Sequence, residues 1–232
     1  MLIFNYILLT ILGLGPSVTW LVFYLREDAN HPEPRKLLFY TFLSGAVITL
    51  MVLQIQLIVN RWLTSSGVDG YGSLSFLMLA IVEEFFKFLA VYLVIRYRPE
   101  FDEPVDAMIY MIVGALGFAA VENVASVFQA NGAFFPTPGP LETTILRFVG
   151  ATLLHTLASG FVGYEWGRAK AEGRDPKFSI FIGLAGATLL HAIFNYLIIK
   201  SGPVTLPIVL LVLVAPFLLS DFEKLKHLRN KI

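Results

Sequence analysis

The chain has 232 residues, of which 56% are hydrophobic and only 15% are Asp, Glu, Lys or Arg, and its net charge is zero. Soluble domains average about 25% charged residues, and the mean hydropathy here is +0.73, so the composition indicates a polytopic membrane protein. No basic patch lies outside the loops, so no nucleic-acid partner is indicated, and the absence of cysteine excludes disulfides and thiolate metal ligands.

Seven apolar stretches follow one another along the chain, each close to the ~20 residues that a helix needs to cross a bilayer. They cover approximately residues 3–25, 37–59, 74–96, 105–128, 143–168, 178–200 and 204–220. Lipid offers the backbone no hydrogen-bond partners, so each stretch is predicted to be helical. The first lacks the basic start of a cleaved signal peptide and is too long for one. The last contains Pro207 and Pro216 and is expected to be kinked.

The basic residues alternate between the two sides of these stretches. Thirteen lie in the loops after the first, third and fifth stretches and in the C-terminal tail, whereas the opposite loops hold only Arg61 and Lys200. By the positive-inside rule the N-terminus is outside and the C-terminus is cytoplasmic. We therefore predict an all-α helical bundle with seven transmembrane helices, forming one integral membrane domain over residues 1–232.

Three charged residues lie in the middle of the third stretch: Glu83, Glu84 and Lys87. An ionised side chain at the bilayer centre costs at least ~2.5–3.5 kcal/mol, so these residues are expected to face the protein interior or a watery cavity. Lys87 is spaced to pair with either glutamate. The two glutamates point about 100° apart on a helix, so we expect them to have different roles.

Further polar residues lie deep in the next three stretches. Glu122 is in the fourth and His155 in the fifth, while His191 and Asn195 share one face of the sixth because they are four residues apart. Counted from the outer helix ends at ~1.5 Å per residue, Glu83, Glu122, His155 and His191 fall in one layer of the outer half of the bilayer. Many small residues in these helices predict close packing between them.

This set of side chains is typical of a catalytic zinc site. Two imidazoles and a carboxylate supply three ligands and leave a position for water, and a second carboxylate can act as general base. We predict that Glu122, His155 and His191 bind Zn²⁺ and that Glu83 or Glu84 is the base.

The remaining polar residues receive supporting roles. Lys87 is expected to hold the second glutamate ionised or to stabilise an oxyanion, and Asn195 to be a fourth ligand, a partner of a ligand or an oxyanion donor. Glu142 and Arg147 are expected to form a salt bridge at the outer rim. The chemistry indicated is metal-assisted hydrolysis inside a membrane, and the bond expected to be cleaved is a peptide bond.

Three spaced motifs, E-E-x-x-K, F-x-x-x-E and H-x-x-x-N, begin at residues 83, 118 and 191, with His155 between the last two. This pattern resembles the PrsW family of bacterial intramembrane proteases, which is related to the CAAX prenyl endopeptidases and to the Aph-1 subunit of gamma-secretase. The resemblance covers residues 74 to about 200, which would be the catalytic core helices.

The resemblance implies a multi-pass protein of the prokaryotic plasma membrane that cleaves a membrane-anchored protein, of the anti-sigma-factor type, on its extracytoplasmic side. The CAAX relatives have histidine where Glu122 stands, which leaves a glutamate-only mechanism open. Two other functions also stay open: a proton- or ion-coupled transporter, and a non-catalytic scaffold like Aph-1. The sequence shows no inverted repeat or paired broken helices of the kind found in transporters.

Overall fold

The computed structural model describes residues 2–27, 31–132, 138–200 and 204–229, and these residues form α-helices and connecting turns with no strand. In chain order the helices are α1 (Leu2–Glu27), α2 (Arg35–Ser65), α3 (Ser73–Ile95), α4 (Asp106–Gly132), α5 (Pro140–Val149), α6 (Ala151–Ala171), α7 (Pro176–Lys200) and α8 (Thr205–Arg229). The prediction of an all-α bundle is confirmed.

Six segments within the described residues are long and apolar enough to cross a membrane: α1, α2, α4, the joined pair α5 and α6, α7, and α8. The helix α3 has 23 residues, which is also enough to cross, but it carries three charged side chains in its middle. The seventh crossing therefore stays a prediction, and so does the orientation of the termini.

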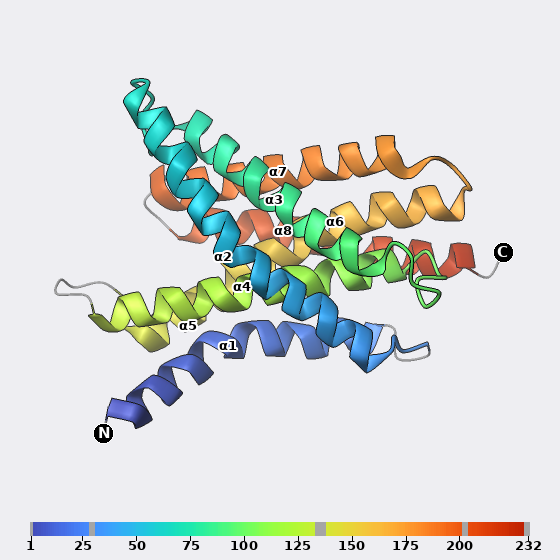
Figure 1. The fold of residues 1–232 in the computed structure, drawn as a ribbon, viewed down its shortest axis with the longest axis horizontal. Coiled ribbons are helices and arrows are strands. Elements are labelled where there is room, and N and C mark those ends of the chain that lie inside the picture. Colours follow the sequence, from blue (N-terminus) through green and yellow to red (C-terminus); the bar gives the residue numbers. More distant parts are fainter. Residues whose placement is uncertain (1, 28–30, 133–137, 201–203, 230–232) are drawn as a thin grey trace.

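Most of the helices run back and forth along the long axis of the molecule, whereas α2 and α3 cross it obliquely, and the start of α1 and the end of α8 lie at opposite ends of the bundle (Figure 1). The turns between α3 and α4 and between α6 and α7 lie at the same end as the C-terminus (Figure 1). The basic loops that were predicted to share one side of the membrane thus share one end of the bundle.

The centre of the bundle is α4, which packs against α1, α2 and α6. Every residue from Asp106 to Ala120 is buried. Small side chains make this possible, since a Cβ atom on Gly117 would lie 1.9 Å from the carbonyl oxygen of Phe42 on α2. Glycine lets the two backbones touch, as is common between membrane helices.

The fifth predicted span, 143–168, is not one continuous helix. The helices α5 and α6 meet at Gly150, whose φ of −108° and ψ of −98° lie outside helical geometry. The short helix α5 packs on α1 and α4, where Trp20 donates a hydrogen bond to the carbonyl oxygen of Phe148 at 3.0 Å and stacks on its ring. The last helix also differs, because α8 continues past residue 220 to Arg229.

Candidate active site

The polar side chains predicted to share a layer meet in the structure, and Glu84 is at the centre of their contacts. Lys87 Nζ donates a hydrogen bond to Glu84 Oε1 at 2.6 Å, and His191 Nδ1 lies 2.6 Å from the same oxygen. Glu84 and Lys87 are each only 1% exposed. The helices α3 and α7 are therefore joined by a buried pair of opposite charges and an imidazole.

The contact with Glu84 fixes the state of His191. An ionised carboxylate only accepts hydrogen bonds, so Nδ1 carries a proton and donates it, which leaves Nε2 as an acceptor in the neutral ring. His191 Nε2 faces Glu83 Oε2 at 3.5 Å, and this oxygen has no hydrogen-bond partner among the described residues. Two acceptors that face each other in a buried space need a cation or a proton between them.

A glutamine that the sequence analysis did not select holds Glu83 in place. Gln56, on α2, donates a hydrogen bond from Nε2 to Glu83 Oε1 at 2.6 Å. The bond occupies one carboxylate oxygen and leaves Oε2 directed at His191. The signal in the sequence was weak, because Gln56 is one of three amides, with Gln54 and Asn60, in the apolar stretch of α2.

His155 contacts charged groups through both ring nitrogens. Its Nδ1 lies 3.0 Å from Lys87 Nζ, and its Nε2 lies 3.0 Å from Glu122 Oε2. An ammonium group only donates, so Nδ1 accepts and Nε2 carries the proton that Glu122 accepts. The two imidazoles are close, with ring centroids 5.4 Å apart. His155 can bind a metal only after one of its two contacts opens.

Arg147 belongs to this network, so the expected rim salt bridge with Glu142 was wrong. Its Nη2 donates to Glu122 Oε2 at 3.0 Å, and its Nε donates to Asn123 Oδ1. Asn123 in turn donates to Thr152 Oγ1 at 3.0 Å. The break at Gly150 lets α5 turn Arg147 toward α4.

The residues that fit a metal ion are Glu83, His155 and His191. All three are buried, and each offers one ligand atom within 4.8 Å of the others. Zinc bonds of about 2.0–2.1 Å place tetrahedral ligand atoms roughly 3.3 Å apart, close to the 3.5 Å between His191 Nε2 and Glu83 Oε2. The carboxylate ligand predicted from the sequence is Glu122, whereas the compact group contains Glu83.

Asn195 lies at the edge of the site. It is half-buried one turn beyond His191 on α7, and its side chain forms no hydrogen bond with another described residue. Its predicted role as a ligand or an oxyanion donor stays a prediction.

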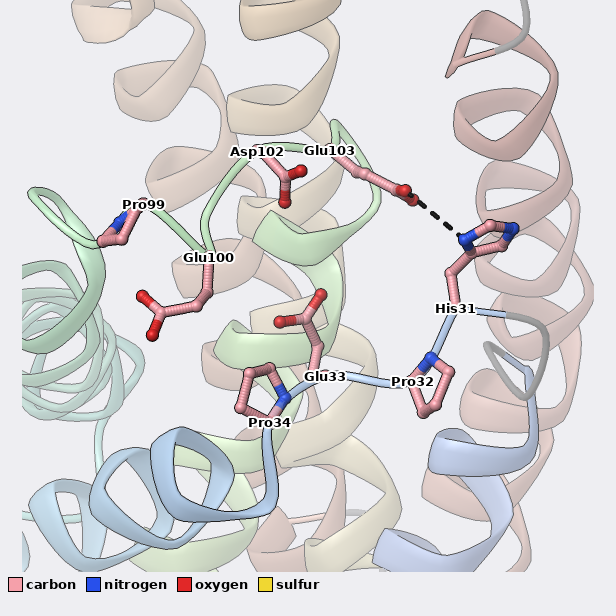
Figure 2. Close-up of a pocket in the computed structure, with 8 residues that line it drawn as sticks. All are labelled: His31, Pro32, Glu33, Pro34, Pro99, Glu100, Asp102 and Glu103. Carbon is pink, nitrogen blue, oxygen red and sulfur yellow. Dashed lines mark ion pairs between the residues drawn. The ribbon is translucent and has the colours of Figure 1, made fainter.

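A cavity with several carboxylates lies away from this site, in the turns before α2 and α4 (Figure 2). It has a volume of about 560 Å³, and the carboxylates of Glu33 and Asp102 point toward each other across it (Figure 2). His31 pairs with Glu103 at 3.9 Å. Burial raises the pKa of the Glu33 carboxyl above its usual range. This cavity contains neither of the two buried imidazoles.

The comparisons with known proteins point to one family. The family model described as "PrsW family intramembrane metalloprotease" matches residues 33–220, which include the whole network from Gln56 to His191. The "Protease PrsW" of Geobacillus kaustophilus is 29% identical over 190 residues, covering 82% of this chain and 79% of that protein. That of Oceanobacillus iheyensis is also 29% identical, covering 80% of each chain.

A third relative aligns over almost the full length. The "Protease PrsW" of Clostridioides difficile is 24% identical over 228 residues, covering 97% of this chain and 94% of that protein. No solved structure matches the chain.

Proposed function

The chain belongs to the PrsW family of intramembrane metalloproteases, and from this premise we propose that it hydrolyses a peptide bond of a membrane-anchored protein with a zinc-bound water and a glutamate base. It is a multi-pass protein of the prokaryotic plasma membrane. Family membership favours proteolysis over the transporter and the scaffold.

One observation carries the proposal. Glu83 Oε2 and His191 Nε2 are buried acceptors that face each other at 3.5 Å, and His155 lies within reach of both. This donor set suits zinc, and the lone carboxylate oxygen of Glu83 has no other described partner to satisfy it. We assign Glu83, His155 and His191 as the residues that hold the metal.

Zinc held there would supply a polarised water molecule that is nucleophilic at neutral pH. Glu84 accepts the Nδ1 proton of His191 and so keeps Nε2 directed at Glu83, an arrangement that supports many metal-binding histidines. Lys87 balances the charge of Glu84, and Gln56 holds the other oxygen of Glu83.

Glu122 is the remaining carboxylate beside the imidazoles, and we assign it as the general base. It is more exposed than Glu83 or Glu84, with a side chain that is 19% exposed, so water has access to it. A base in this place takes a proton from the attacking water and returns it to the leaving amine. Asn195, whose amide has no hydrogen bond with the described residues, is positioned to donate to the substrate carbonyl oxygen.

The substrate is proposed from the position of the site. The predicted topology puts the polar layer in the outer half of the bilayer, which favours cleavage of a single-span protein of the anti-sigma-factor type near its extracytoplasmic side.

Metal content of the detergent-purified protein, compared between the wild type and three variants, tests the assignments. We expect about one zinc per chain in the wild type, loss of zinc in Glu83→Gln and in the His155→Ala, His191→Ala double variant, and retained zinc without cleavage in Glu122→Gln. Loss of zinc in Glu122→Gln but not in Glu83→Gln would exchange the assigned roles, so that Glu122 would be the metal ligand and Glu83 the base. A folded, chelator-free wild type without metal would refute the zinc site and leave a glutamate-only hydrolase.

A further inference from the structure

The charged residues of the site differ in how exposed they are. The ion pair between Glu122 and Arg147 forms the exposed edge of the site. The Arg147 and Glu122 side chains are 20% and 19% exposed, against 2% for His155 and 1% for Glu84. The network therefore reaches the surface beside α5, at the carboxylate assigned as the base.

Two helices that meet at Gly150 converge on one atom at this edge. Arg147 Nη2, near the end of α5, and His155 Nε2, one turn into α6, each lie 3.0 Å from Glu122 Oε2. A straight helix through Gly150 would turn residues 147 and 155 in directions about 80° apart, because successive residues are spaced about 100°. The break allows both to reach the same oxygen.

The guanidinium group also contacts the residue next to the glutamate, because Arg147 Nε donates to Asn123 Oδ1. A planar guanidinium with two donors on neighbouring acceptors fixes orientation in a way that a single ammonium cannot. Arg147 itself is held in place because Trp20 bonds and stacks against the adjoining residue, Phe148.

We propose that Arg147 is a positioning residue, which holds Glu122 against the imidazole of His155 from the exposed edge of the site. The inference rests on the proposed function for the role of Glu122, but the contact itself does not. When His155 binds a metal, it releases Glu122, and the ion pair with Arg147 then keeps the Glu122 carboxylate next to the imidazoles.

The test compares Arg147→Met and Arg147→Lys with Arg61→Met, an exposed arginine on α2 without a described ion pair. Zinc affinity is measured by chelator competition, and cleavage is measured as kcat and KM. Removal of a group that supports a metal site usually costs 10–100-fold in affinity or activity. We expect a fall of about that size in kcat for Arg147→Met, a smaller fall for Arg147→Lys and none for Arg61→Met.

Chemical rescue separates the charge of Arg147 from its packing. The chain has no cysteine, so Arg147→Cys can be modified at that position alone with a cationic aminoethyl or an anionic sulfonatoethyl thiosulfonate reagent. We expect the cationic adduct to recover part of the lost kcat and the anionic adduct to recover none. Equal recovery by both reagents would contradict a role for the charge.

A double-mutant cycle distinguishes this inference from the zinc site. The melting temperatures of Arg147→Met, Glu122→Gln and the double variant should be non-additive because the side chains are in contact. If the wild type holds no zinc but the two substitutions are still non-additive, the zinc site is refuted and the positioning of Glu122 by Arg147 is not. Altered melting temperatures with an unchanged kcat would reduce Arg147 to a structural tie and overturn the proposal, as would additive melting temperatures.

Discussion

Replacement of Lys87 by methionine tests the charge balance on which the site depends. Lys87 and Glu84 are each 1% exposed, and their charged atoms are 2.6 Å apart. At an effective dielectric constant of 20, this separation corresponds to an attraction of about 6 kcal/mol. Burial offsets part of this, and removal of one partner of a buried pair costs about 3–5 kcal/mol because the other charge is left alone.

We therefore expect Lys87→Met to lower the free energy of unfolding by about 3–5 kcal/mol. The double variant Lys87→Met, Glu84→Gln should lose about 2–3 kcal/mol less than the sum of the losses of the two single variants, because neither charge is then left without its partner. The assay is reversible unfolding of the purified protein from mixed micelles. Lys200→Met is the control, because Lys200 is 41% exposed and lies 3.6 Å from Asp69, and such pairs contribute about 0–1 kcal/mol.

A loss below 1 kcal/mol for Lys87→Met would refute the reasoning. It would mean that Glu84 is uncharged in the folded protein, and that His191 Nδ1 is not held by a carboxylate as argued above.

Two further predictions concern packing and pH. Gly117→Ala should lower the free energy of unfolding by about 1–3 kcal/mol, because the new Cβ would lie 1.9 Å from the Phe42 carbonyl oxygen. Gly15→Ala is the control, because no atom lies within 4 Å of a Cβ at that position. Equal unfolding curves for the two variants would contradict the tight packing of α2 on α4. Burial raises the pKa of Glu33, so its carboxyl favours folding below the unfolded pKa, and this contribution is lost as the pH rises through the folded pKa. Glu33→Gln should therefore raise the melting temperature at pH 8 and not at pH 4, since Tyr110 can still donate to the amide oxygen as it does to Glu33; a lower melting temperature at pH 8 would contradict this.

The sequence was informative about the helices and about which charged side chains meet. Long apolar stretches and the cost of burying charge are properties of each segment alone, so the helical elements and the cluster around Glu84, His155 and His191 could be predicted. The break at Gly150 could not, because glycine is common inside membrane helices and only the packing of α5 on α1 and α4 selects the bend.

The partners of individual atoms were also beyond the sequence. Spacing places Glu83 and Glu122 at similar depths, but which carboxylate faces both imidazoles depends on the rotation of α3 and α4 about their axes. The hydrogen bond from Gln56 to Glu83 could not be predicted either, because it depends on how α2 packs against α3. The apolar stretch of α2 carries three amides, Gln54, Gln56 and Asn60, and nothing in their spacing indicated which of them would contact Glu83.

The ion pair within α3 has a consequence for how the chain enters the membrane during synthesis. Glu84 and Lys87 are one turn apart, so α3 brings its own counter-charge, and Glu83 finds Gln56 on the helix made just before it. The two histidines arrive only with α6 and α7. We therefore expect the α2–α3 hairpin to insert as a unit before the site exists. A chain truncated after residue 103, which keeps the turn that follows α3, should hold α3 across the bilayer, and the Lys87→Met form of that chain should not. Labelling of a cysteine placed in the turn at residue 98 with a membrane-impermeant reagent would show which side it occupies.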